Sequence, residues 1–364
     1  MICRIISLLQ REEGFNMAKK QYYSIDKLLK VAAEYYMLLG ERSNGKSYQV
    51  KLTALKDALK GERFVYIRRW DNDIKARTVE NYFTDKHLSE ETGLEEFYGL
   101  KARSGEIFLA DEEGNRTDQI VGYYCALNIA ERYKSNVFTN VKNIIVEEFI
   151  TDGAYLYDEP VKLMQLVSTI ARDENVRVFL IGNTLSRVCP YFAHWCLEGV
   201  LKQKLGTIEV YNYHEEDRTV RIAVEYCANA GTTSNMFFGR AARQIVSGEW
   251  DTYDLPRIPR SQLEYDMIYE VMITYQSFRF CMQLLIEPKK GGTIVFVYPL
   301  TKKRKIYRQI QEDFSDLPNV TNQLDAHIKP EALMIECYRK GKICYSDNLT
   351  GSDFKHVIEN LQIF

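Results

Sequence analysis

Short apolar runs alternate with amphipathic segments along the first half of the chain, a pattern typical of an α/β fold. The runs are rich in aromatic and β-branched residues, as the buried strands of a parallel sheet are. We expect strands at 34–40, 64–67, 144–146 and 176–181. The segments that follow the first and third runs place apolar residues at near-helical spacing. Together these patterns predict a parallel or mixed sheet flanked by helices.

The second half of the chain has a different pattern. Residues 207–226 alternate in the manner of half-buried strands, and a stretch rich in Gly, Asn, Ser and Thr follows them. From 262 onwards, apolar runs on either side of a KKGG turn predict a hairpin of 281–286 with 293–298. We therefore divide the chain into four parts. They are an N-terminal extension (1–16), an α/β domain (17–206), a linker or lid (207–261) and a smaller α+β domain (262–364).

Composition and charge exclude several classes of protein. The chain has 364 residues and a formal net charge of −2, so it is not a polybasic protein that binds nucleic acid over its whole surface. Its cysteines are scattered and none forms a C-x-x-C pair, which disfavours a zinc site or a disulfide framework and fits a reducing cytoplasm. The apolar run near the N-terminus is too short to span a bilayer. MAKKQYYS at 17–24 resembles a natural start, so we treat residues 1–16 as an extension.

The first expected strand leads into a sequence of the form G-x-x-x-x-G-K-S. Its residues are Gly40, Glu41, Arg42, Ser43, Asn44, Gly45, Lys46 and Ser47. Strand, glycine loop and helix follow one another, which is the context that a phosphate-binding loop requires. Backbone N–H groups and the helix N-terminus would face the phosphates of ATP, with Lys46 on the β and γ phosphates and Ser47 on Mg²⁺. The alternative is a polar turn before an amphipathic helix.

Two further polar groups are expected at the same edge of the sheet. The strand at 144–146 ends in Glu147 and Glu148, of which the first would hold the Mg²⁺ shell and the second would polarise an attacking water. Asn183 follows the next strand, where its side chain could sense the γ-phosphate or orient water. Ligands of such sheets bind at the carboxyl ends of the strands, so these groups would converge. The alternatives are a solvated acidic loop and an asparagine that hydrogen-bonds its own backbone.

Two other segments lie between the glycine loop and the acidic strand. Arg68 and Arg69 follow the strand at 64–67, where they would either touch phosphates or DNA or lie solvated. Residues 80–130 are polar and irregular, and we expect a hairpin there before an Ala- and Tyr-rich helix near 121–133.

These segments resemble the DNA-packaging ATPases, or encapsidation proteins, of phi-29-like podoviruses. The resemblance is carried by LLGERSNGKSY, GERFVYIRRW, NVKNIIVEEFI and VRVFLIGNTLSRVCPYF, in that order and at similar spacing. It covers roughly residues 30–195 and is faint beyond them. It implies a P-loop ATPase of the additional-strand group, with Walker A and Walker B motifs, that works as a terminase-like motor.

The resemblance also implies partners. Such motors form homo-oligomeric rings, expected here as pentamers, that drive double-stranded DNA through the portal, or connector, of a preformed procapsid. ATP and Mg²⁺ are the implied cofactors, and the participation of a packaging RNA is left open. The protein would act in the host cytoplasm, docked transiently on the procapsid and away from membranes. The alternatives are another ring translocase or helicase, and a nucleotide-binding interaction module without turnover.

The resemblance assigns roles to further residues. Glu148 matches the catalytic glutamate of the family, whereas Glu147 departs from the aspartate that is common there. Ring ATPases of this kind complete their site with a basic residue of the neighbouring subunit. Arg172 is the first candidate for this trans-acting residue and Arg177 the second, and Lys134 falls where the family carries a lysine. For each of them, a surface ion pair is the alternative.

For residues 262–364 the resemblance implies a ribonuclease-H-like fold that has lost its chemistry. Glu270, Glu287 and Asp325 are available, but no paired acid lies on an expected strand to hold two metal ions. We therefore expect no nuclease activity.

The same segment is not broadly basic, since it contains 13 Lys and Arg and 13 Asp and Glu. Its basic cluster is TKKRK at 301–305, with Arg308 and the turn at Lys289 and Lys290 in addition. This cluster would hold a phosphate backbone without reading bases, as a motor requires, or it would be a solvated turn.

Overall fold

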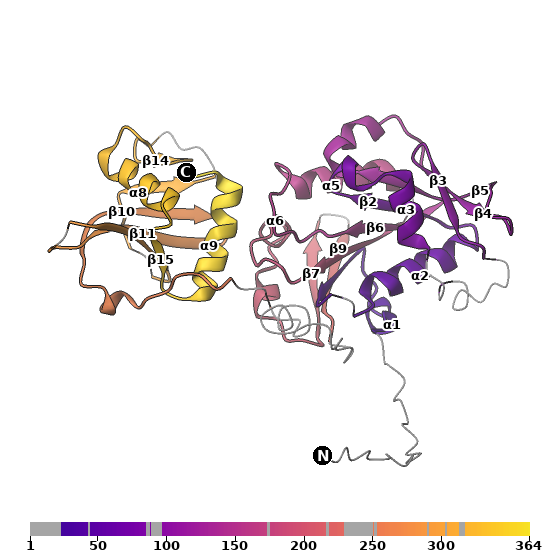
Figure 1. Ribbon diagram of the computed structural model, residues 1–364. Coiled ribbons are helices and arrows are strands. Elements are labelled where there is room, and N and C mark those ends of the chain that lie inside the picture. The colour runs from indigo at the N-terminus through magenta and orange to yellow at the C-terminus, as the bar shows by residue number, and fades with distance from the viewer. Residues whose placement is uncertain are drawn as a thin grey trace, which may run out of the picture.

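The computed structural model has two lobes, one from the first part of the chain and one from the last (Figure 1). It describes residues 23–42, 44–84, 88, 97–172, 175–215, 218–228, 250, 253–289, 291–302, 304–312 and 317–364. The expected extension 1–16, Ser43 of the glycine loop and residues 229–249 of the expected linker lie outside this range.

The N-terminal lobe contains, in its described residues, one sheet of nine strands. In order across the sheet they are β3 (Leu100–Arg103), β4 (Glu106–Ala110), β5 (Arg116–Ala126), β2 (Arg63–Arg68), β6 (Val141–Glu147), β7 (Arg177–Asn183), β1 (Tyr35–Gly40), β9 (Thr219–Tyr226) and β8 (Ile208–His214). The strands from β5 to β9 in this order run parallel, and antiparallel strands close both edges. The expected mixed α/β sheet is thereby confirmed.

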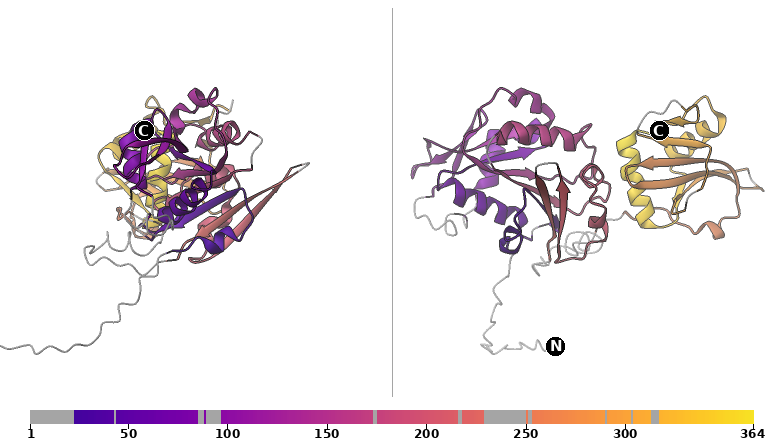
Figure 2. Two further views of the ribbon diagram at one scale, coloured as in Figure 1. Left: turned by 90° about the vertical axis from the view of Figure 1, so that its right-hand side faces the viewer. Right: turned by 180° about the vertical axis from the view of Figure 1, so that it is seen from behind.

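Helices cover both faces of this sheet (Figure 2). One face carries α1 (Asp26–Leu29), α2 (Lys46–Ala58) and α3 (Ala76–Phe83). The other carries α5 (Glu159–Ala171), α6 (Pro190–His194) and the 3-10 helices η2 (Leu127–Tyr133) and η3 (Glu198–Lys202). In β1, Tyr36 and Leu38 face the first layer, and Met37 and Leu39 face the second. Burial on both faces explains why the strands appear in the sequence as continuous apolar runs.

The first half of one expected helix is a strand in the structure. Residues 121–126 belong to β5, which pairs in parallel with β2, and only the residues after them form a helical segment. A Cβ on Gly122 would lie 2.7 Å from the carbonyl oxygen of Phe64, so the two strands approach this closely because the residue is glycine. Val121, Tyr123 and Tyr124 are residue types that favour strands, so the local sequence agrees with the strand that the structure shows. The hairpin expected before this segment is present as β3 and β4.

The expected domain boundary at 206 is wrong. The strands β8 and β9 join the N-terminal sheet, with β9 paired in parallel to β1. The alternation of 207–226 predicted these strands but not the sheet that they join, because a period of two is satisfied at any sheet edge. The C-terminal lobe already includes Arg257, whose backbone bridges to Tyr345. The two lobes therefore share the described residues of the expected linker.

The C-terminal lobe contains a second sheet, of six strands among the described residues. Their order is β14 (Val320–Thr321), β13 (Arg308–Gln311), β10 (Asp266–Tyr275), β11 (Phe278–Ile286), β12 (Thr293–Pro299) and β15 (Ile343–Tyr345). β10, β11 and β12 are antiparallel, which confirms the expected hairpin, and β13 and β14 run parallel to β10. The C-terminal lobe therefore has a mixed sheet with helices, in agreement with the expected α+β class.

Two helices, α8 (Lys329–Arg339) and α9 (Asn348–Leu361), complete the C-terminal lobe. They pack on one face of its sheet through Met334, Phe354 and Val357. A short 3-10 helix, η4 (Arg260–Gln262), precedes β10, and another, η1 (Asp71–Asp73), lies in the N-terminal lobe after β2. α9 lies on the side that faces the N-terminal lobe (Figures 1 and 2). Among the described helices, none has the length and hydrophobicity that a transmembrane span requires.

Candidate active site

The glycine loop connects β1 to α2 at the carboxyl-end edge of the first sheet. Gly40 ends β1 with a φ of 147°, and Gly45 precedes α2 with a φ of 101°, angles that other residues rarely adopt. A Cβ on Gly40 would lie 3.1 Å from the carbonyl oxygen of Cys227. Between the glycines, the described residues are buried except for Arg42. The loop is therefore closed tightly over the helix start, as in a phosphate-binding loop.

Lys46 is the first residue of α2, and its side chain is buried inside this loop. Its ammonium group donates to the carbonyl oxygen of Glu41 and to Asn44 Oδ1, 3.3 Å away. A third contact, of 3.4 Å, reaches Oδ1 of Asn183, which lies opposite Gly40 in the sheet. Burial lowers the pKa of Lys46 to about 8. The structure thus brings the glycine loop and the expected sensor residue together.

Ser47 and Glu147 also meet at this edge. The Ser47 hydroxyl donates to Glu147 Oε1 at 2.6 Å, and the Tyr82 hydroxyl of α3 donates to the other carboxylate oxygen at 2.5 Å. Burial raises the pKa of Glu147. Hydroxyl and carboxylate oxygens are the ligands that Mg²⁺ prefers in proteins. Sequence reasoning missed Tyr82, because a tyrosine on an amphipathic helix carries no signal of a site.

Glu148 has different surroundings from Glu147. Its backbone φ is 56°, a left-handed conformation that is uncommon outside glycine. Its carboxylate lies 2.7 Å from Nη2 of Arg68 at the end of β2, and 56% of its side chain is exposed. The two consecutive acidic side chains therefore contact different elements. Glu147 contacts Ser47 of α2, and Glu148 contacts Arg68 of β2.

Arg69 is buried, and it anchors the backbone of this acidic segment. Its guanidinium makes a bidentate ion pair with Glu159, at 2.7 and 3.0 Å. It also donates to the carbonyl oxygens of Glu148, at 3.2 Å, and Phe149, at 2.9 Å. The Tyr191 hydroxyl donates to the same carboxylate of Glu159 at 3.0 Å. Both interpretations given for Arg69, a phosphate or DNA contact and a solvated side chain, are therefore wrong.

Arg177 lies at the amino ends of the parallel strands, whereas the glycine loop lies at their carboxyl ends. It begins β7, whereas Asn183 ends it, and a strand of this length separates the two by about 20 Å. Its guanidinium forms an ion pair with Asp57 and donates from Nε to Asn143 Oδ1 at 3.0 Å. The structure does not bring Arg177 to the site of its own chain.

Arg172 and Lys134 lie close to one another on the surface, away from the glycine loop. Arg172 follows α5 and donates to the carbonyl oxygen of Asn136 at 3.1 Å. Lys134 lies two residues before Asn136 and pairs with Glu131, and both of these side chains are exposed. Two segments that are distant in the sequence thus present the two basic candidates on one part of the surface.

The acids expected in the C-terminal lobe do not form a cluster. Both carboxylate oxygens of Glu270 on β10 accept from Nη2 of Arg304, at 2.8 and 2.9 Å. Glu287 lies at the hairpin turn after β11, and Asp325 lies before α8. Within the described part of the chain, no group of three or more His, Cys, Asp or Glu is placed to hold a metal ion.

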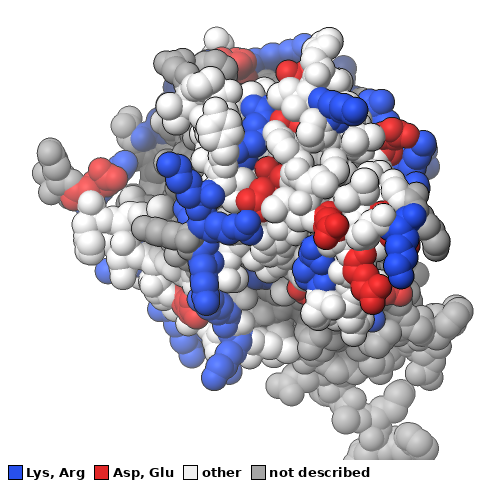
Figure 3. All heavy atoms as spheres, turned by 90° about the vertical axis from the view of Figure 1, so that its left-hand side faces the viewer, with Lys and Arg blue, Asp and Glu red and all other residues white. Residues whose placement is uncertain are grey.

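Lys and Arg side chains gather on the face of the C-terminal lobe that points away from the N-terminal lobe (Figure 3). From the expected basic cluster, Lys302, Arg304 and Lys305 are exposed. Arg308 was expected to extend this cluster, but it is buried in an ion pair with Glu331, at 2.7 and 3.0 Å. The exposed cluster is therefore smaller than the sequence indicated.

The chain is similar to known proteins of one family. Residues 17–217 match the family model for the Podovirus DNA encapsidation protein (Gp16). The DNA packaging protein of Bacillus phage phi29 is 30% identical over 181 residues, which are 48% of this chain and 50% of the relative. The match thus spans about half of the length of that relative.

Two solved structures are similar in fold to the whole chain. The Phi-28 gp11 DNA packaging motor has a TM-score of 0.53 at 18% identity, over 95% of this chain and 99% of that chain. The bacteriophage Phi-29 viral genome packaging motor assembly has a TM-score of 0.54 at 18% identity, over 94% and 99%. At these identities, the similarity concerns the fold alone. Since the family model covers more than half of the sequence, the chain belongs to the Podovirus DNA encapsidation protein (Gp16) family.

Proposed function

We propose that the protein is an ATP-driven motor that moves double-stranded viral DNA into a preformed procapsid through its portal. One observation carries this proposal: Lys46 and Ser47 of the glycine loop contact Asn183 and Glu147, at the ends of two neighbouring parallel strands. A nucleotide pocket at this edge is what hydrolysis coupled to movement requires. Family membership, and a relative that is named a DNA packaging protein, support the coupling to DNA.

The residues at this edge fit a nucleotide with Mg²⁺. Asn44 Nδ2 is buried and lacks a hydrogen-bond partner among the described residues, so the loop holds a donor that a phosphate oxygen would satisfy. Ser47 and Glu147 would hold Mg²⁺, directly or through water. When bound, Mg²⁺ neutralises the charge that develops on the phosphates during hydrolysis.

The protein's own groups bind the nucleotide and orient the attacking water. The N–H groups at the start of α2 and the Lys46 ammonium bind phosphate oxygens. Glu148 orients the water and accepts its proton, for which its carboxylate has to leave Arg68. Asn183, in contact with Lys46, responds to the γ-phosphate through the end of β7.

In this proposal the active chains form a ring, of five copies, in which each site is completed by its neighbour. Arg172 supplies the trans-acting guanidinium, with Arg177 as the second candidate, and Lys134 acts beside Arg172 or on DNA. Their distance from the glycine loop of their own chain supports this assignment, because a residue at the opposite edge can serve only another copy's site.

The proposed partners follow from the same function. DNA is bound through its phosphates, because a packaging motor has to pass any sequence, and the run of Lys and Arg side chains on the outer face of the C-terminal lobe suits such contacts (Figure 3). The portal of the procapsid is the docking partner, and a packaging RNA would lie between them if one takes part. The motor works in the host cytoplasm while docked on the procapsid.

The test is ATP hydrolysis by the purified full chain, with and without DNA and portal-bearing procapsids. We expect turnover that the procapsids stimulate, and its loss in Lys46→Ala and in Glu148→Gln. Glu148→Gln should still bind nucleotide, since Glu148 is not in the glycine loop. Glu336→Gln is the control, because it removes only an exposed ion pair with Lys340 on α8.

Two outcomes would contradict the proposal. Stimulation by forked DNA but not by procapsids would favour a helicase or another ring translocase. No turnover with DNA, procapsids and Mg²⁺ all present would favour a nucleotide-binding module without hydrolysis.

A further inference from the structure

Two loops leave the candidate active site and run towards the C-terminal lobe. The acid loop, residues 149–156, follows Glu148, and the sensor loop, residues 184–188, follows Asn183. Both loops reach α9, the helix of the C-terminal lobe that faces the N-terminal lobe (Figure 1). A single helix of one lobe therefore contacts both loops that directly follow catalytic candidates of the other.

The sensor loop contacts α9 through a charge and through an apolar side chain. Arg187 Nη1 lies 3.0 Å from Asp353 Oδ2, and the two side chains are 22% and 10% exposed. The ion pair is therefore largely shielded from water, and removal of one partner leaves the other charge poorly solvated. The next residue, Val188, is buried in the core of the C-terminal lobe together with Phe280 and Phe354.

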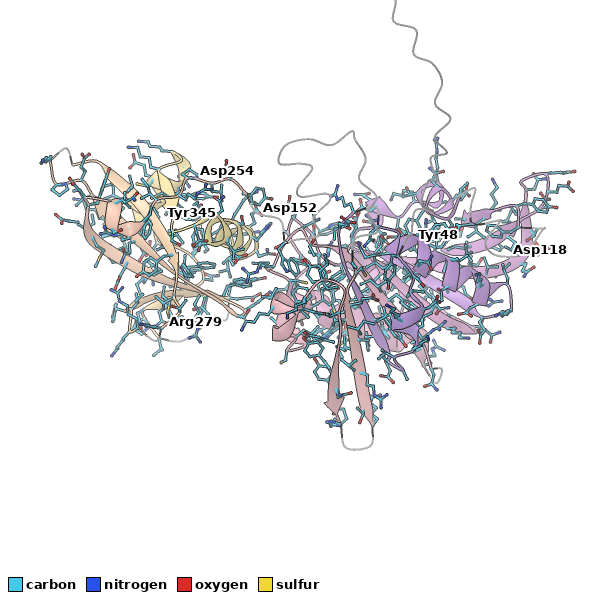
Figure 4. The ribbon with its side chains drawn as sticks, turned by 90° about the horizontal axis from the view of Figure 1, so that it is seen from below. Tyr48, Asp118, Asp152, Asp254, Arg279 and Tyr345 are labelled. Atoms are coloured by element: carbon cyan, nitrogen blue, oxygen red, sulfur yellow. The ribbon has the colours of Figure 1, made fainter. Side chains whose placement is uncertain are left out.

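The acid loop contacts α9 through its backbone and through Asp152. The N–H group of Tyr155 donates to Asn360 Oδ1 at 3.4 Å. Asp152 accepts a hydrogen bond from the Tyr253 hydroxyl, and its carboxylate lies 3.8 Å from Nδ1 of His356. Asp152 lies on the side of the N-terminal lobe that faces α9 (Figure 4).

The same loop is fixed to the active site at its other end. The Arg69 guanidinium holds the carbonyl oxygens of Glu148 and Phe149, and its partner Glu159 accepts from the N–H group of Leu156 at 3.0 Å. The acid loop thus has fixed points at the catalytic glutamate and at the lobe boundary, with little free chain between them.

We propose that α9 positions the acid and sensor loops, so that a movement of the C-terminal lobe changes the rate of ATP hydrolysis. The effect on hydrolysis rests on the proposed function, whereas the contacts between α9 and the two loops do not depend on it. Arg187 lies four residues after Asn183, and Asp152 lies four residues after Glu148. Short loops held at both ends transmit a shift of the helix, and misplacement of a catalytic group by about 1 Å can cost a hundredfold in rate.

Asp353 is a positioning residue in this scheme, because it acts through Arg187 and touches neither the glycine loop nor the acidic pair.

The decisive variant is Asp353→Asn in the full chain, because it removes the charge and keeps the shape of the side chain. The assay is run at pH 8. Burial raises the pKa of Asp353 to about 7, so its carboxylate is mostly ionised in the wild type at that pH. We expect the turnover number to fall about tenfold, and the Kd for a non-hydrolysable ATP analogue to change less than about twofold. The reversed pair, Arg187→Asp with Asp353→Arg, should restore turnover to within about threefold of the wild type.

A second measurement is independent of hydrolysis. In the chain without nucleotide, amide hydrogen exchange in the acid and sensor loops should become faster in Asp353→Asn. Glu336→Gln, which breaks an exposed pair on α8, is the matched control and should leave both turnover and exchange unchanged.

The outcomes separate the two proposals. Unchanged exchange in Asp353→Asn would show that the Arg187–Asp353 pair does not hold the loops and would overturn the proposed route of coupling. Faster exchange with unchanged turnover, or no rescue by the reversed pair, would overturn the coupling. If the wild-type chain hydrolyses no ATP, the proposed function fails, and the exchange measurement still decides whether α9 holds the loops.

Discussion

Arg68 and Arg69 are the same residue type at consecutive positions, yet the structure gives them different surroundings. The Arg68 guanidinium pairs with the exposed Glu148, whereas the Arg69 guanidinium is buried against Glu159. The sequence could not separate them, because Arg68 ends β2 and Arg69 follows it, and only the fold decides which of the two side chains is buried. The glycine loop was predictable residue by residue, because its motif and its flanking elements specify its backbone.

The two arginines should differ strongly in their contribution to stability. Arg69→Met leaves the Glu159 carboxylate buried without its partner, so we expect the free energy of unfolding to fall by about 3–5 kcal/mol. Arg68→Met removes a partly exposed pair and should cost less than about 1 kcal/mol. Urea denaturation of the full chain measures both variants. Equal destabilisation by the two changes would contradict the assignment of Arg69 as the buried anchor.

The protonation of Lys46 gives a second prediction at this scale. Burial lowers the pKa of Lys46 to about 8 in the chain without nucleotide, and bound phosphates would raise this pKa again. At pH 8, nucleotide binding should therefore take up about half a proton, and affinity should fall as the pH rises above this value. Titration calorimetry in buffers of different ionisation enthalpy measures this uptake.

Lys46→Arg is the control, because its guanidinium stays protonated throughout this pH range. Uptake that is the same in this variant as in the wild type would mean that another group is responsible.

At the scale of elements, prediction succeeded where local pattern decides and failed where contact with another strand decides. The strands β1, β6 and β7 and the helix α2 follow from apolar runs and spacing. The segment at 121–126, VGYYCA, was expected as the start of a helix although Val and Tyr favour strands. β9 was assigned outside the sheet because alternation does not indicate which strand lies beside it. The second error concerns a pairing between residues that are distant in the sequence, and such a pairing leaves no local signal.

Gly122 offers a direct test of the pairing between β5 and β2. In Gly122→Ala the new Cβ would lie 2.7 Å from the Phe64 carbonyl oxygen, so the strands would have to separate, and we expect a loss of about 2 kcal/mol. Gly153→Ala is the matched control, because the nearest atom to its Cβ is the Thr151 hydroxyl at 3.7 Å. The control should be neutral or stabilising by up to about 1 kcal/mol. Thermal unfolding compares the two, and an unaffected Gly122→Ala would mean that β5 lies farther from β2.

At the scale of the whole molecule, the proposed function divides the residues needed for hydrolysis between two copies of the chain. The glycine loop, the acidic pair and Asn183 lie at one edge of the sheet, while Arg172 and Lys134 lie elsewhere on the surface. Sequence reasoning supplied the candidates for the second half but could not place them, because the position of a trans-acting group depends on the packing between copies. The surface that carries Arg172 and Asn136 is therefore the face expected to meet the neighbouring site.

Mixed assemblies test this sharing of sites. Lys46→Ala chains cannot bind nucleotide productively but still offer Arg172, whereas Arg172→Ala chains keep their own site and lack the residue for their neighbour. Each population alone should be inactive with procapsids and DNA. In an equal mixture, a working site needs an Arg172→Ala chain beside a Lys46→Ala chain, so about a quarter of the sites should recover hydrolysis.

A mixture of Lys46→Ala with Glu148→Gln is the control and should recover nothing, because both changes disable a chain's own site. If the first mixture also stays inactive, Arg172 does not act between subunits, and the same design with Arg177→Ala tests the second candidate.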